Sequence, residues 1–134
     1  MLGEKIGEES GKIIGQRVLP SEGGLPRMEI TVQSSGKIIG VDYNATVTYR
    51  SGARPGGGLW GEGEGVLMTK DGDSAILTGS GVGKMGAGGA GSWRGALYYQ
   101  TTSAKLAKLN SLCAVFENEV DATGNATGKY WEWK

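Results

Sequence analysis

Carboxylate side chains in this sequence occur in pairs two residues apart, an arrangement that can serve acid–base catalysis. Glu62 and Glu64 form one pair, and Glu117 and Glu119 form the other. In a β-strand, residues i and i+2 point to the same face, so the members of each pair lie side by side. On a solvent face such a pair only aids solubility. On a buried face beside Arg94 or Lys84, repulsion and desolvation would favour a protonated carboxyl group and create a general acid.

Aromatic side chains are concentrated late in the sequence, where they are candidates for lining a cavity. In SWRGALYYQ, alternation places Trp93 and Tyr99 on one face of a strand, and Trp131 and Trp133 share a face of the final strand. These rings either fill the core of a small barrel or line a cavity for an apolar, planar ligand. The candidate ligand-binding residues are Tyr43, Trp60, Glu62, Glu64, Trp93, Arg94, Tyr99, Phe116, Trp131 and Trp133.

Several kinds of site are excluded by composition. Histidine is absent and Cys113 is the only cysteine, so a Ser-His-Asp triad, a Cys-His dyad and a structural zinc site all lack their residues. We expect no metal and no cofactor, and no catalytic residue can be assigned. Lys plus Arg and Asp plus Glu both number 14, and this balance gives no basic field to attract nucleic acid.

The stretch LTGSGVGKMGAGGAGSWRG, residues 77–95, contains a lysine among glycines and suggests a phosphate-binding loop at first sight. A P-loop requires G-x-x-x-x-G-K-[ST], but Thr78 occupies the first glycine position and Met85 follows the lysine. A dinucleotide-binding fingerprint requires a helix directly after its glycines, and GAGGAGSW is a poor helix former. The sequence therefore argues against nucleotide binding.

The glycines alternate instead, as expected for β-strands. Gly61, Gly63 and Gly65 lie on one face of one strand, and Gly79, Gly81 and Gly83 lie on one face of the next. The two rows face each other if the turn at Asp71-Gly72 has three loop residues, and they are offset by one if it has two. Such bare patches either let the sheet coil sharply or leave room for a ligand or a neighbouring subunit.

Strand-sized segments separated by turn signals run along the whole chain and predict an all-β domain. The Asp-Gly pair is a strong hairpin signal, and GVDYNATVTYR alternates apolar and polar residues with period two. Because an antiparallel meander must protect its edges, we expect residues 1–134 to form one closed barrel of about eight strands. SAKLAKLN predicts one short helix near 104–110 with Ser103 as its N-cap. The expected strands are 12–19, 27–34, 40–50, 59–70, 74–84, 91–102, 111–121 and 127–134.

This layout, together with LTGSGVGK followed by GAGGAGSWRG, resembles the allene oxide cyclase barrel class, to which dirigent proteins and several small bacterial proteins of unknown function are similar. The resemblance implies a barrel with an apolar cavity, often assembled as a dimer or trimer. No catalytic motif of either group can be placed on this sequence, so no activity is transferred by the resemblance.

Three functions remain open from the sequence. The first is binding of an apolar or aromatic small molecule in the barrel lumen, the second a cofactor-free isomerase or cyclase that uses lumen carboxylates, and the third a structural scaffold. Glycine-rich bare strands and zero net charge favour a homo-oligomer. The charged opening MLGEKIGEES and the lack of a long apolar run predict a cytoplasmic protein with no membrane contact.

Overall fold

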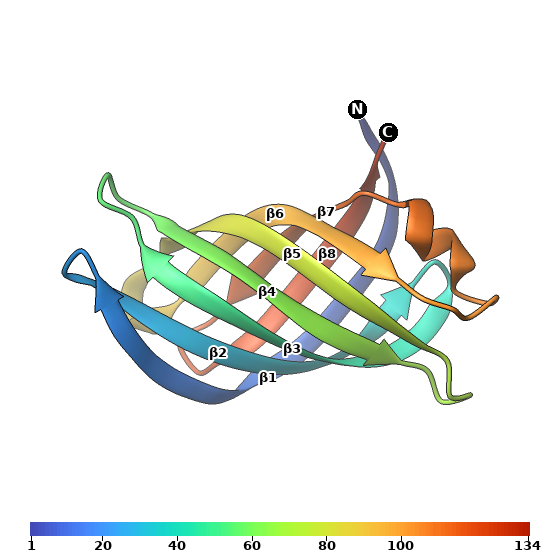
Figure 1. Cartoon of the computed structure of the whole chain (residues 1–134), viewed down its shortest axis with the longest axis horizontal. Helices are drawn as coiled ribbons and strands as arrows, with labels where there is room; N and C mark the ends of the chain where they lie inside the picture. Colours follow the sequence, from blue (N-terminus) through green and yellow to red (C-terminus); the bar gives the residue numbers. More distant parts are fainter.

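Eight antiparallel strands, joined in sequence order, close into a barrel in the computed structural model, which describes residues 1–134 (Figure 1). β8 pairs with β1, so the sheet has no free edge, and the predicted barrel is confirmed. No helix in the structure has the length and apolar character needed to span a membrane. The strands are β1 (Leu2–Glu22), β2 (Leu25–Ile38), β3 (Val41–Ala53), β4 (Leu59–Met68), β5 (Ser74–Met85), β6 (Gly91–Gln100), β7 (Ala114–Val120) and β8 (Asn125–Trp133).

β1 is 21 residues long and begins ten residues before the strand predicted at 12–19. It pairs with β8 along its first half and with β2 along most of its length, and register shifts between Lys5 and Gly7 and between Ile13 and Gly15 bend it. The first half carries glycines and charged residues and has little apolar alternation. Its strand conformation is therefore dictated by pairing with two neighbours, a long-range contact that local sequence does not encode.

Three hairpins share one loop design. The N–H of Thr69 donates to Asp73 O, and the N–H of Gly72 donates to Thr69 O, while Gly72 has a φ of 89°. The same pattern occurs at Arg54–Gly58 and at Asp121–Asn125, with a positive φ at Gly57 and Gly124. This is a three-residue loop whose left-handed position favours glycine. The hairpin predicted at Asp71-Gly72 is confirmed. Its loop has three residues, which is the longer of the two lengths that the sequence allowed.

The β7–β8 loop gives a pH-dependent prediction. Asp121 Oδ1 accepts hydrogen bonds of 2.9 Å from the backbone N–H of Asn125 and that of Thr123. These bonds, with those from the two side chains, lower the pKa of Asp121 to about 2 from 3.8. Because the folded-state pKa is the lower one, the stabilisation is present above about pH 4 and disappears as the pH falls through 2. A carboxyl ¹³C titration by NMR should give this pKa, and an unshifted value would refute the loop contacts.

One end of the barrel is closed by the β6–β7 connection, which contains the 3₁₀ helix η2 (Ala107–Ser111; Figure 1, orange). Leu106, Leu109 and Leu112 are fully or nearly fully buried there and belong to the main apolar core. The predicted helix near 104–110 is therefore present only as this short 3₁₀ turn. Ser103 does not cap it, because its hydroxyl donates to Asp73 Oδ1 at 2.8 Å and ties the connection to the β4–β5 loop.

Strand order places four of the seven connections at the opposite end of the barrel. They are the β1–β2 turn, the β3–β4 loop, the β5–β6 connection with the 3₁₀ helix η1 (Ala87–Gly89), and the β7–β8 loop. None of these connections contains a buried apolar residue, in contrast to the leucine-filled end. The barrel therefore has one closed apolar end and one open end.

Candidate ligand-binding lumen

A partly enclosed cavity of about 130 Å³ lies inside the barrel. Its lining comes from all eight strands, and 14 of its 24 residues are hydrophobic. The same strand face that lines the cavity is the buried face in the alternating burial of β3, β4 and β5. The cavity is therefore part of the architecture of the sheet.

The two glycine rows lie on this inner face and directly opposite each other. Gly61 pairs with Gly81, Gly63 pairs with Gly79, and Gly81 pairs in turn with Gly95 on β6. A methyl group on Gly95 would overlap the backbone of the neighbouring strand, 2.6 Å from the Cα of Gly81. The glycines therefore permit close approach of neighbouring strands in a strongly curved sheet, as one of the two sequence interpretations expected.

Aromatic rings occupy the space that the missing side chains leave. A Cβ on Gly83 would lie 2.8 Å from the Trp93 indole, and one on Gly61 would lie 2.9 Å from the same ring. The ring of Phe116 covers Gly81 and Gly95 in the same way. Tyr49 meets Trp93 edge to face, with ring centroids 5.7 Å apart and an interplanar angle of 71°. Because the glycines have no side chains, the aromatic rings can pack closely against the backbone of the barrel wall.

The polar part of the cavity is centred on Glu9. Tyr43 donates a 2.9 Å hydrogen bond to Glu9 Oε1, and Tyr130 donates a short hydrogen bond to the same oxygen. Neither bond uses Oε2. A Cβ on Gly128 would lie 2.5 Å from Asn118 Oδ1, 2.9 Å from Tyr130 Oη and 3.2 Å from Glu9 Cγ, so these groups converge over that glycine.

Burial keeps the tyrosines of this cluster protonated. It is the largest cause that raises the pKa of Tyr43, Tyr99 and Tyr130 above 10.0, and the Glu9 carboxylate is the second. Their hydroxyl groups therefore remain hydrogen-bond donors at all physiological pH values. Asn118 Oδ1, by contrast, is buried and has no hydrogen-bond partner. The cluster combines one carboxylate held by two neutral donors with one unsatisfied carbonyl oxygen.

Four of the ten residues predicted to line the lumen place their side chains there: Tyr43, Trp93, Tyr99 and Phe116. Glu62 borders the cavity only through its backbone, because its neighbours Gly61 and Gly63 are the inward residues. The other five lie on the outer face, where strand register places them: Trp60, Glu64, Arg94, Trp131 and Trp133.

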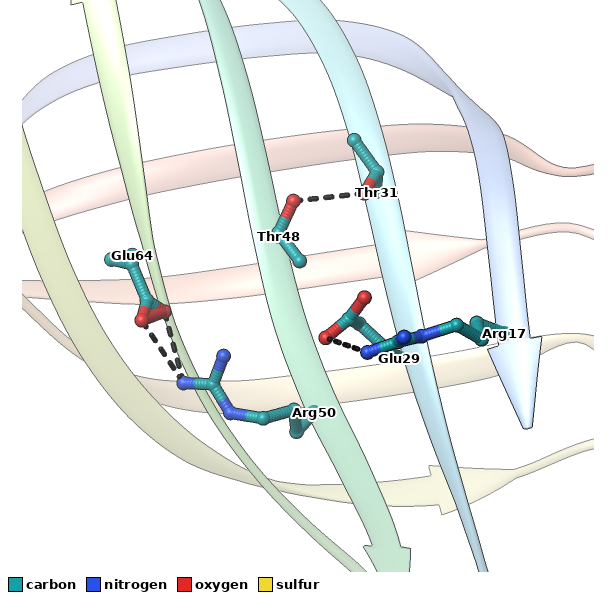
Figure 2. A network of polar contacts seen from close by, with 6 residues as sticks. All are labelled: Arg17, Glu29, Thr31, Thr48, Arg50 and Glu64. Carbon is teal, nitrogen blue, oxygen red and sulfur yellow. Dashed lines mark hydrogen bonds and ion pairs between the residues drawn. The ribbon is translucent and has the colours of Figure 1, made fainter. Parts of the chain in front are cut away.

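Three of the four paired carboxylates, Glu64, Glu117 and Glu119, form ion pairs on this outer surface. Arg50 donates to both oxygens of Glu64, at 2.9 and 3.2 Å, within a row of polar contacts that crosses β1 to β4 (Figure 2). Arg94 lies 3.3 Å from Glu119 and 3.8 Å from Glu117 on the outer face of β6 and β7. The general acid that a lumen-facing pair would have created is therefore absent, because both pairs lie on the strand face opposite to the glycines, as the solvent-face alternative required.

Glu9, Tyr49, Asn118 and Tyr130 line the cavity but were not among the predicted residues. A signal for Glu9 exists in the sequence, because Gly7, Glu9 and Gly11 repeat the alternation with glycine that marks the inner face of β4. The register of β8 explains Tyr130: it pairs with Phe116, while Trp131 pairs with the outward Val115. The prediction for this strand is therefore wrong about the inner face, because the face with one tyrosine and one glycine is less conspicuous in the sequence than the face with two tryptophans.

No family model matches the chain, and no curated protein does. Three solved structures share its fold. A protein with unknown function from Clostridium acetobutylicum ATCC 824 is 11% identical, with a TM-score of 0.81 over 96% of both chains. A conserved protein of unknown function from Rhodopseudomonas palustris is 13% identical, with a TM-score of 0.83 over 98% of this chain and 97% of its own.

A beta-barrel like protein from Acinetobacter baumannii AYE is 14% identical, with a TM-score of 0.82 over 100% of this chain and 96% of its own. At these identities the likeness concerns the fold alone. The comparisons support the small-barrel part of the sequence resemblance, and they do not extend to the allene oxide cyclase class. The chain thus shares a small eight-stranded barrel with bacterial proteins from three different genera.

Proposed function

We propose that the protein binds a small, mainly apolar molecule in the barrel lumen. The observation that carries this proposal is a cavity of about 130 Å³ that has aromatic walls and a single inward carboxylate, Glu9. An apolar cavity of roughly 150 Å³ is large enough to bind benzene. The size therefore favours a ligand with about one six-membered ring over a lipid or a fused-ring molecule.

The interior supports binding in a defined orientation. Tyr49 and Trp93 lie on the inner face near the ends of β3 and β6 that meet the open-end connections, whereas Tyr43 lies near the opposite end of β3 and Phe116 pairs with Tyr130 beside Glu9. A ring inserted through the open end would contact these aromatic side chains, and a polar substituent would reach Glu9. The isomerase alternative loses its original support, since Glu62 and Glu64 face outward.

The binding proposal predicts that an obstruction inside the barrel abolishes binding. Val47 lines the cavity, while its neighbour Thr46 is exposed on the outer face. Calorimetric titration with toluene should detect binding to the native protein. Val47→Phe should lower the affinity at least tenfold by filling the lumen, and Thr46→Phe should leave it unchanged. Equal binding by both variants would refute the proposal, as would failure of the native protein to bind any one-ring probe.

Self-association remains a prediction, and the outer surface offers an observation in its favour. Val66 and Ile76 are paired across β4 and β5 and are 45% and 54% exposed, with Tyr98 on the next strand 54% exposed. Contiguous exposed apolar side chains of this kind often mark contact surfaces. We therefore expect a dimer or trimer that buries the outer face of β4 to β6.

A further inference from the structure

We propose that the lumen ligand is a small organic amine, bound as its ammonium cation beside Glu9. This inference rests on the proposed function and specifies the chemistry of the ligand. It follows from the polar groups of the cavity, which carry a negative charge and hydrogen-bond acceptors but no positive charge. The apolar walls require that the rest of the molecule be hydrocarbon.

The first step concerns charge. The residues that line the cavity include no lysine and no arginine. Glu62 is the only other acidic residue among them, and its side chain points to the outer surface. Glu9 is therefore compensated only by the hydroxyl groups of Tyr43 and Tyr130. Glu9 is partly buried and no cationic side chain of the lining offsets its charge, so a bound ammonium group would provide the missing partner.

The second step concerns hydrogen bonding. Both tyrosines donate to Oε1, so Oε2 of Glu9 has no protein donor. Their donor hydrogens are used in these bonds, and only the acceptor lone pairs of the two hydroxyl oxygens remain for a ligand. Asn118 Oδ1 is a buried carbonyl oxygen with no partner, and its dipole adds to the negative potential over Gly128. Around Glu9 a ligand that donates hydrogen bonds meets two free acceptors, Glu9 Oε2 and Asn118 Oδ1, whereas the hydroxyl donors of Tyr43 and Tyr130 are already used.

The third step concerns the rest of the ligand. An ammonium group has three donors, and it can bond to Oε2 while it contacts the faces of the surrounding tyrosines, which attract cations. The aromatic and glycine-lined half of the cavity would hold one ring or a short branched chain. Charge-assisted hydrogen bonds are stronger than neutral ones, so the amine should outbind an uncharged molecule of the same shape.

Four one-ring probes test this inference on the native protein by calorimetry: benzylamine, benzyl alcohol, toluene and benzoate. Benzylamine should bind roughly 10- to 100-fold more tightly than benzyl alcohol or toluene, and benzoate should bind most weakly. If toluene binds and benzylamine binds no more tightly, the amine inference fails while the proposed lumen function stands. If benzoate binds most tightly, the inference is also overturned. If none of the four binds, the proposed function itself fails.

A matched pair of variants locates the effect. Glu9→Gln removes the charge, while the remaining amide oxygen can still accept both tyrosine hydrogen bonds. It should remove the advantage of benzylamine over toluene. Glu8→Gln removes one negative charge from the outer face of the same strand, where Glu8 pairs with Lys5 at 2.5 Å, and should preserve the advantage. Equal loss of the advantage in both variants, or retention in Glu9→Gln, would contradict a role for Glu9.

Discussion

Replacing Gly95 with alanine should lower the free energy of unfolding by about 3 kcal/mol or more, at the upper end of overpacking effects. A Cβ at this position would overlap Ser80 O and lie 2.9 Å from Phe116 Cε2. The carbonyl belongs to the paired strand β5, so relief would require the two strands to separate. Urea denaturation followed by circular dichroism measures the effect.

Gly15→Ala is the matched control for this substitution. Gly15 also lies in a strand, at a register shift of β1, but a Cβ there would have no atom within 4 Å. Removing a glycine at a compatible position should leave stability unchanged or raise it by up to about 1 kcal/mol. If Gly95→Ala proved as mild as Gly15→Ala, the close approach of β5 and β6 would be wrong.

Truncating Leu109 to alanine should lower the free energy of unfolding by about 2–5 kcal/mol. Leu109 is 0% exposed although it lies in a connection between strands, and it belongs to the main core together with Leu106 and Leu112. Its removal would leave a void at the closed end of the barrel. Thermal and urea unfolding of the purified variant test this prediction.

Lys108→Ala is the control in the same 3₁₀ helix, since Lys108 is exposed and its side chain makes no ion pair. We expect a change within about 0.5 kcal/mol for this variant. A loss for Leu109→Ala no greater than that of Lys108→Ala would show that η2 does not contribute to the core.

The fold was predictable because its signals are local. Asp71-Gly72 marks a hairpin by turn chemistry, and Tyr43 to Tyr49 mark a half-buried strand by alternation. The first half of β1 was missed because Gly7, Glu9 and Gly11 carry no apolar side chain on their inward face. Its pairing with β8 is fixed by residues more than a hundred positions away.

The site was less predictable, because alternation identifies two faces of a strand but not which one is inside. In β6 the aromatic face containing Trp93 and Tyr99 is the inner one. In β8 the same reasoning favoured Trp131 and Trp133, which lie outside, since Gly128 and Tyr130 face the lumen. The inner face of this barrel is marked by glycines beside large rings, a pairing that becomes visible only when neighbouring strands are aligned.

Closure of the barrel between β1 and β8 has a kinetic consequence. Seven of the eight strand ladders join neighbours in the sequence and can form as hairpins, whereas the β1–β8 ladder joins residues such as Glu8 and Lys129. Closing so long a loop is slow, so we expect the β1–β8 ladder to form late in folding. Glu9 and Tyr130, which are 121 positions apart, form a hydrogen bond across this ladder. The polar cluster would therefore be assembled only when β1 and β8 pair. A molecule bound to the cluster would stabilise this pairing and slow unfolding.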